Sequence, residues 1–179
     1  MPNPPAPNGG GSLVNTYTII MDVLFPTNSD GGVRPLVQTD DQEITPGADF
    51  VVDSSGGIGA PPGPFNGSIK ANTWYRIGFS VTPTEIDEYI NGVKVNTQTT
   101  GSLDSEWALT PGGVAQLFQN STLAGAAAGY VSSIQIQDVA LNAGQMAALG
   151  AASASKITTN SRRCLRSWNR KTRCPMRPT

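Results

Sequence analysis

Apolar and polar residues alternate with a period of two along several segments of this chain, which predicts β-strands. In residues 16–25 the apolar face consists of Tyr17, Ile19, Met21 and Val23. Residues 73–81 form the clearest strand pattern, with an apolar face made of Tyr75, Ile77, Phe79 and Val81. Shorter strands are expected in residues 34–39, 49–53, 114–119 and 130–139. The chain therefore consists mainly of short strands.

Turn and cap residues divide these strands and predict one helix. Asn91-Gly92 lies inside residues 86–95 and indicates a hairpin, because Asn-Gly readily adopts the positive φ angles of a type I′ turn. Asn142 as N-cap, Gln145 completing a capping box and Gly150 as C-terminal stop predict a short helix between them. Residues 54–67, with five glycines and three prolines, predict a loop. Short strands with a single helix favour an all-β fold, a two-sheet antiparallel sandwich.

Three segments resemble motifs of laminin-G-like domains in the concanavalin A-like lectin and glucanase superfamily. Residues 71–81 resemble the W-x-x-V-x-F strand, and residues 88–93 resemble the L-Y-V-N-G hairpin. Residues 129–142 and 146–150 resemble the closing strand and the helix after it. The resemblance spans residues 16–150 and implies a jelly roll with adjacent first and last strands. It also implies an accessory module of secreted or surface proteins, although structural motifs transfer a fold better than a function.

The ends of the chain differ from this middle part in composition. Residues 1–15 contain four prolines and three consecutive glycines, which predicts a linker within a larger multidomain chain. All 13 acidic residues lie between Asp22 and Asp138, whereas residues 151–179 carry eight basic residues and no acidic one. We expect a disordered basic tail that contacts nucleic acid only non-specifically. Its Cys164 and Cys174 could close a disulfide loop in an oxidising compartment.

Composition excludes several classes of function. The chain has no histidine, which rules out Ser-His-Asp and Cys-His nucleophile pairs and histidine metal sites. No apolar run approaches the roughly 18 residues of a membrane-spanning helix, and the first twelve residues lack the pattern of a signal peptide.

A short acidic segment resembles a catalytic motif without matching its geometry. Residues 85–88 resemble the Glu-x-Asp-x-Glu strand of glycoside hydrolases in the same superfamily. In a strand, Glu85, Asp87 and Tyr89 share one face, and Glu88 points to the other. We therefore expect solvated carboxylates and no catalysis. A glycoside hydrolase using Glu85 and Asp87, and a purely structural or assembly domain, stay open as alternatives.

Two sets of residues are candidates for ligand binding. Asp40 and Asp41 follow a strand and, with Asn120, could supply the oxygen ligands that calcium prefers at one rim of the sandwich. Trp74 and Trp107 could stack on sugar rings, although the motif position of Trp74 also fits a core residue. We predict a non-catalytic binding or spacer module of an extracellular or cell-surface protein. Its ligands would be glycans or proteins, with calcium assisting.

Overall fold

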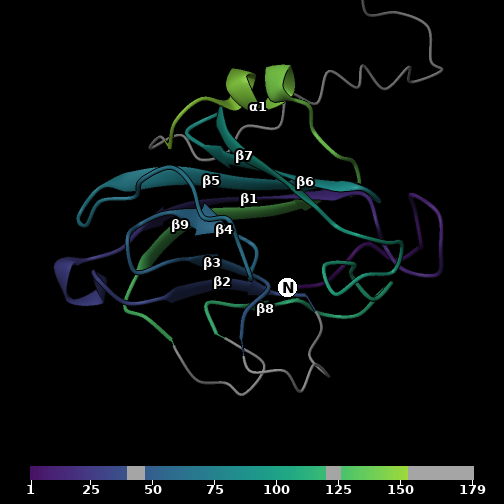
Figure 1. The fold of residues 1–179 in the computed structure, drawn as a ribbon, viewed down its shortest axis with the longest axis horizontal. Helices are drawn as coiled ribbons and strands as arrows, with labels where there is room; N and C mark the ends of the chain where they lie inside the picture. Colours follow the sequence, from purple (N-terminus) through teal and green to yellow (C-terminus); the bar gives the residue numbers. More distant parts are fainter. Residues whose placement is uncertain (40–46, 120–125, 153–179) are drawn as a thin grey trace, which may run out of the picture.

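A computed structural model of the chain describes residues 1–39, 47–119 and 126–152. Its strands are β1 (Tyr17–Leu24), β2 (Arg34–Gln38), β3 (Phe50–Val52), β4 (Ile58–Gly59), β5 (Trp74–Val81), β6 (Glu85–Ile90), β7 (Val93–Thr99), β8 (Gln116–Leu117) and β9 (Tyr130–Gln137). The helices are the short 3-10 turn η1 (Thr27–Ser29) and α1 (Ala143–Leu149). Two antiparallel sheets with the orders β7-β6-β5-β1-β9 and β4-β3-β2-β8 form two layers, with α1 above the larger sheet (Figure 1). The predicted all-β sandwich with adjacent first and last strands is confirmed.

The main core lies between the two sheets and uses the predicted apolar faces. β1 pairs with β5 in a register that sets Ile19 opposite Phe79 and Met21 opposite Ile77, and all four side chains are fully buried. Phe79 meets Phe50 of the other sheet with ring centroids 4.4 Å apart. The period-two patterns therefore identified the inward face of the central strands correctly.

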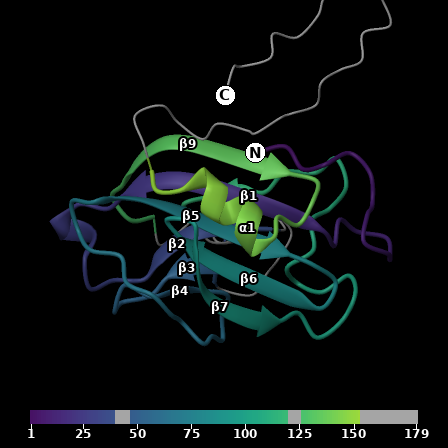
Figure 2. The same ribbon diagram turned by 90° about the horizontal axis from the view of Figure 1, so that it is seen from above.

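A second, smaller core lies on the outer face of the five-stranded sheet, beneath α1. It consists of the buried side chains Ile20, Tyr89, Leu141 and Met146. The capping box predicted for this helix is present, with Asn142 and Gln145 each accepting a hydrogen bond from the other's backbone N–H. A Cβ at Gly78 would clash with Met146 Cε, so glycine at this position lets the helix side chain fit against the sheet. Seen from above, α1 lies across the strands of this sheet (Figure 2).

A buried ion pair joins the sheet to the end of the helix. Asp22 of β1 and Arg76 of β5 are register partners, and the guanidinium donates from Nε and Nη2 to the two carboxylate oxygens at 2.8 Å each. Arg76 Nη1 also donates to the carbonyl of Leu149 at the end of α1. This bidentate geometry satisfies a charge that would otherwise be costly to bury.

Residues 1–15, predicted as a linker, contact the sandwich at several points. Pro2 bridges to Val114, and the backbone of Val14 exchanges two hydrogen bonds with Leu109, with Val14 fully buried. Prolines are compatible with this position because an edge segment needs few backbone donors.

One aspartate fixes the second half of this N-terminal segment. The Asp104 carboxylate accepts hydrogen bonds from the backbone N–H groups of Ser12 and Leu13 and from the Asn15 side-chain amide. These hydrogen bonds hold the pKa of Asp104 well below its usual value, and the one from Asn15 has the largest effect. Composition alone does not reveal such long-range contacts, and this is why the glycine-rich segment looked unstructured in the sequence. The tail prediction for residues 153–179 falls outside the described residues.

The ion pair generates a test of what holds the helix to the sheet. Asp22→Ala leaves the Arg76 guanidinium buried without its carboxylate, so the free energy of unfolding should fall by about 3–5 kcal/mol in urea titrations at pH 7. The double variant Asp22→Leu with Arg76→Met buries no charge and should lose much less. Equal losses in the single and double variants would contradict this account.

Candidate functional site

Three large side chains form an exposed row on the outer face of the five-stranded sheet. Leu24 of β1 lies directly opposite Trp74 of β5 on one side and Tyr130 of β9 on the other. Trp74 is 41% exposed and Tyr130 is 62% exposed, while Leu24 between them is half-buried. Because neighbouring strands lie about 4.8 Å apart, the backbones of Trp74 and Tyr130 are about 10 Å apart. We call these three residues the aromatic row.

The position of α1 leaves this row uncovered. The outer face of β1 presents Thr18, Ile20, Asp22 and Leu24 in succession. The helix covers Ile20 and ends where Arg76 binds Leu149, two register positions before the pair of Leu24 and Trp74. The aromatic row therefore lies just beyond the C-terminal end of α1, next to an ion pair that carries no net charge.

Short polar side chains border the aromatic row at both ends. Next to Trp74 in the sequence, Asn72 and Thr73 are exposed, and Asn72 Nδ2 donates to Thr27 Oγ1 at 2.8 Å. Ser132 is exposed close to Tyr130. The site thus combines aromatic faces with hydroxyl and amide groups, which suits an uncharged ligand that has both apolar faces and hydrogen-bonding groups.

Of the two tryptophans predicted as ligand-binding residues, one is exposed and the other is buried. Trp74 is exposed in the aromatic row, although its motif position also fitted a core residue. Trp107 is only 8% exposed and belongs to the main core, where its carbonyl accepts a hydrogen bond from the Tyr17 hydroxyl. Its ring is therefore buried in the core and is not exposed for stacking on a sugar ring.

Tyr130 was missed by the sequence analysis. Its only signal is an aromatic residue at the start of the closing strand, and the register with β1 that sets it opposite Leu24 cannot be read from one sequence. That register shifts at a bulge between Asp22 and Val23, which decides the face on which Tyr130 lies.

The predicted calcium ligands cannot be placed. Asp40, Asp41 and Asn120 lie outside the described residues, so the calcium site stays a prediction. Within residues 1–39, 47–119 and 126–152, no group of three or more Cys, Asp or Glu side chains is arranged to hold a metal ion. No helix in these same ranges is long and apolar enough to cross a membrane.

The acidic residues of β6 do not converge. Asp87 Oδ1 accepts from Lys94 Nζ at 2.8 Å and from Thr97 Oγ1 at 2.7 Å. Partial burial acts to raise the pKa of Asp87, but these hydrogen bonds hold it below its usual value. Glu85 is exposed, and Glu88 is fully buried on the face turned toward the other sheet. The assignment of Glu88 to the opposite face of the strand is therefore confirmed.

Glu88 of β6 is a fully buried carboxyl group. It lies opposite Phe79 and Asn96 in the sheet, and neither carboxylate oxygen has a hydrogen-bond partner among those residues. The loop after β4 covers this region, since Gln98 Nε2 donates to the Ala60 carbonyl at 2.7 Å. Burial is the main cause that raises the pKa of Glu88 to about 7, and the nearby Asn96 amide and Ala60 N–H offset it only in part.

Comparison with known proteins adds to the picture of the fold. No family model and no curated protein matches the chain. A Trypanosoma rangeli sialidase in complex with the inhibitor DANA is 15% identical, with a TM-score of 0.52 over 76% of this chain and 22% of that chain. The receptor-binding domain of botulinum neurotoxin C/D mosaic serotype is 10% identical, with a TM-score of 0.51 over 75% and 35%.

The chain thus spans less than a quarter of the sialidase and about a third of the toxin domain. At such low identities the likeness concerns the fold alone. Both neighbours are consistent with the two-sheet sandwich described above.

Glu88 generates a pH prediction. An ordinary glutamate has a pKa near 4.5, and the folded value is about 7, so the unfolded chain releases this proton first as pH rises. Stability should therefore fall as the pH rises from 5 to 7 and level off above 7. Glu88→Gln, which stays neutral, should be about 3 kcal/mol more stable than wild type at pH 8 and nearly equal at pH 4.5. Thermal melts across this range measure the difference.

The matched control for this experiment is Glu85→Gln on the same strand. Glu85 is exposed, so its replacement should leave the pH dependence of the melting temperature as in wild type. If the melting temperature of Glu88→Gln changed between pH 5 and 7 as it does in wild type, Glu88 would not be the group that causes the pH dependence.

Proposed function

We propose that this domain is a non-catalytic carbohydrate-binding module of an extracellular or cell-surface protein. The aromatic row is its binding site. The observation that carries the proposal is the pair of exposed rings, Trp74 and Tyr130, on one face of three neighbouring strands. The laminin-G-like motifs in the sequence support a module of this class within a larger protein.

The chemistry of the aromatic row favours a sugar chain. Pyranose rings have an apolar face of C–H groups that stacks on an aromatic ring, and hydroxyl groups around the edge that form hydrogen bonds. The backbones of Trp74 and Tyr130 are about 10 Å apart, which is close to the length of two sugar rings in an extended chain. Leu24 offers an apolar floor between the two rings. The neutral surroundings favour an uncharged glycan.

Two other functions have less support. A protein ligand could cover the same exposed apolar patch, but the row is narrow and bordered by short polar groups. A glycoside hydrolase using Glu85 and Asp87 would need both carboxyl groups to reach the substrate, and Lys94 and Thr97 already bind Asp87 Oδ1.

The aromatic row is tested by substitution and glycan binding. Trp74→Ala and Tyr130→Ala should each lower the affinity for a bound oligosaccharide at least tenfold, about 1.4 kcal/mol, because each removes a stacking surface. An array of neutral oligosaccharides identifies a ligand, and calorimetry with that ligand gives the affinities. Val93→Ala removes an exposed side chain on the opposite edge of the sheet and should bind as wild type.

The conservative variant Trp74→Phe separates stacking from folding. It keeps an aromatic face and should retain most of the affinity, with an unchanged melting temperature. If both alanine variants bound the glycan as wild type does, the binding site would lie elsewhere on the domain.

We also propose that calcium assists ligand binding through Asp40, Asp41 and Asn120. Adjacent carboxylates repel one another, so a bound divalent ion relieves this repulsion and stabilises the folded state by mass action. With few carboxylates, the affinity should lie in the weak range of roughly 10⁻⁴–10⁻³ M. Several millimolar calcium should raise the melting temperature of wild type relative to chelator, and Asp40→Asn with Asp41→Asn should abolish the rise. An unchanged wild-type melting temperature would refute the site.

A further inference from the structure

An apolar hollow lies beside the aromatic row, at the first residues of β9. It encloses about 130 Å³, and its walls include Phe25, Phe118, Ala127 and Val131. Tyr130 lines it as well and also belongs to the aromatic row. The described residues around it carry no charge. The hollow is therefore an apolar extension of the surface that we assign to glycan binding.

The floor of the hollow is buried and its mouth is exposed. Val23 and Phe25, which line the bottom, are 1% and 2% exposed, whereas Val131 at the mouth is 44% exposed. A Cβ at Gly129 would lie 3.2 Å from Phe25 Cε1, so glycine at this position keeps the approach to the Phe25 ring open. A small group that enters from the β9 side therefore meets an aromatic ring.

One wall of the hollow has an unfavourable backbone conformation. Phe118, directly after β8, has a φ of 58°, in the left-handed region that bulky residues rarely adopt. Its N–H donates to the Leu36 carbonyl at 3.1 Å, and its side chain packs against the main core. Residues in such conformations persist only where the surrounding structure fixes them, and they are common in ligand sites. This wall is therefore set by the fold before any ligand binds.

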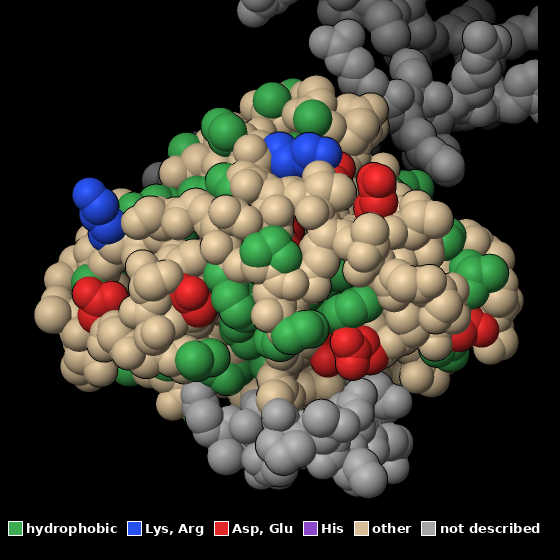
Figure 3. Space-filling view, in the orientation of Figure 1, with side chains coloured by type: hydrophobic (Ala, Val, Ile, Leu, Met, Phe, Trp, Pro, Cys, Tyr) green, Lys and Arg blue, Asp and Glu red, His purple; other side chains and the backbone are tan. Residues whose placement is uncertain are grey.

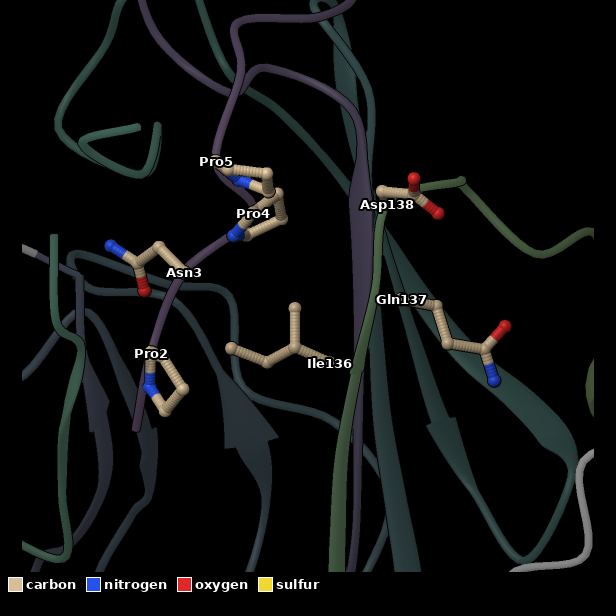
Figure 4. A pocket seen from close by; sticks show the side chains of 7 residues that line it. All are labelled: Pro2, Asn3, Pro4, Pro5, Ile136, Gln137 and Asp138. Carbon is tan, nitrogen blue, oxygen red and sulfur yellow. The ribbon is translucent and has the colours of Figure 1, made fainter. Parts of the chain in front are cut away.

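A larger groove at the other end of β9 has a different character (Figure 4). It measures about 480 Å³ and lies between the prolines of the N-terminal segment and residues 136–138. Ile136 points into it, but the charged Asp138 also lines it, and none of the described residues around it is aromatic. This groove offers no stacking surface, so the hollow next to Tyr130 is the better candidate for extending the glycan site.

Size and charge restrict the group that fits the hollow. Apolar cavities of about 150 Å³ hold a molecule the size of benzene, so this hollow has room for a substituent of a few carbon atoms. The described residues include ten acidic and four basic side chains, a net charge of −6, and acidic groups are spread over the face shown in Figure 3. Such a domain disfavours anionic ligands. Arg34 lies over the Phe25 ring, with Cζ 5.2 Å from its centroid, but it is fully buried and does not line the hollow.

We propose that the hollow binds an acetyl group of the glycan, carried as an amide or an ester, while the sugar ring that bears it stacks on Tyr130. This inference rests on the proposed function and names its ligand class, a neutral glycan with acetylated sugars. The acetyl methyl group lies between Phe118 and Val131. Its polar amide or ester group stays at the exposed mouth, where water can hydrogen-bond to it. The neighbouring sugar ring stacks on Trp74.

Matched oligosaccharides test the acetyl group. The β-1,4-linked tetramers of N-acetylglucosamine and of glucose differ only in the group at C2. Calorimetry should show that the full chain binds the acetylated tetramer roughly fivefold tighter, because burial of one methyl group in apolar surroundings strengthens binding by about this factor. An O-acetylated glucose tetramer decides whether the ester serves as well as the amide. Equal affinities for the acetylated and unacetylated tetramers would overturn the proposal.

A substitution that fills the hollow provides the second test. Ala127→Leu adds apolar atoms to its wall, so the preference for the acetylated tetramer should disappear while the glucose tetramer binds as in wild type. Ala126→Leu is the matched control, because Ala126 is exposed and does not line the hollow, and it should keep the preference. Thermal melts establish that both variants are folded. A preference that persists in Ala127→Leu would contradict the proposal.

Methyl NMR locates the acetyl group without any variant. The methyl signals of Ala127 and Val131 should shift on titration with the acetylated tetramer and stay in place with the glucose tetramer. A preference for acetyl without these shifts would overturn the proposal. Equal binding of both tetramers that is lost in Trp74→Ala would overturn this inference alone and leave the aromatic row as the site. Failure of every neutral glycan to bind would overturn the proposed function together with it.

Discussion

The buried pair of Asp22 and Arg76 decides how the outer face of this domain is divided. It ties the two central strands to each other and holds the last carbonyl of α1 above them. The helix ends at its C-cap Gly150, so it shields Ile20 and Tyr89 and does not extend farther along the sheet. One end of the outer face is a small core, and the other end is left as an exposed aromatic surface.

The two lateral sides of the sandwich are closed in different ways. On the β7 side, the loop after β4 is fixed by side-chain amides, with Asn96 and Gln98 donating to the carbonyls of Pro64 and Ala60. This closure is tight enough to bury the Glu88 carboxyl without a hydrogen-bond partner among the described residues. On the β9 side, the N-terminal segment runs alongside the sheet edge and leaves a groove. The tight closure on the β7 side makes ionisation of Glu88 unfavourable. The loose closure on the β9 side leaves apolar side chains of this edge strand exposed.

Local patterns in the sequence were sufficient for the elements and insufficient for the long-range contacts. The inward faces of β1 and β5, the turn at Asn91 and the cap at Asn142 depend on residues close in the chain, and all were predicted. The burial of Trp107 and the packing of residues 1–15 depend on partners about 90 or more residues away, and the sequence analysis predicted neither. Trp74 was a candidate, whereas Tyr130 needed the β1–β9 register. The calcium ligands fall outside the described residues.

The direction of the aromatic row has a mechanical consequence. Trp74, Leu24 and Tyr130 follow one another across the strands and not along one of them. A ligand that spans the row would therefore connect β5, in the interior of the sheet, to β9, which among the described strands is held by β1 alone. Such a ligand would reduce local opening of β9. It should therefore slow hydrogen exchange of the β9 amides far more than that of the central strands.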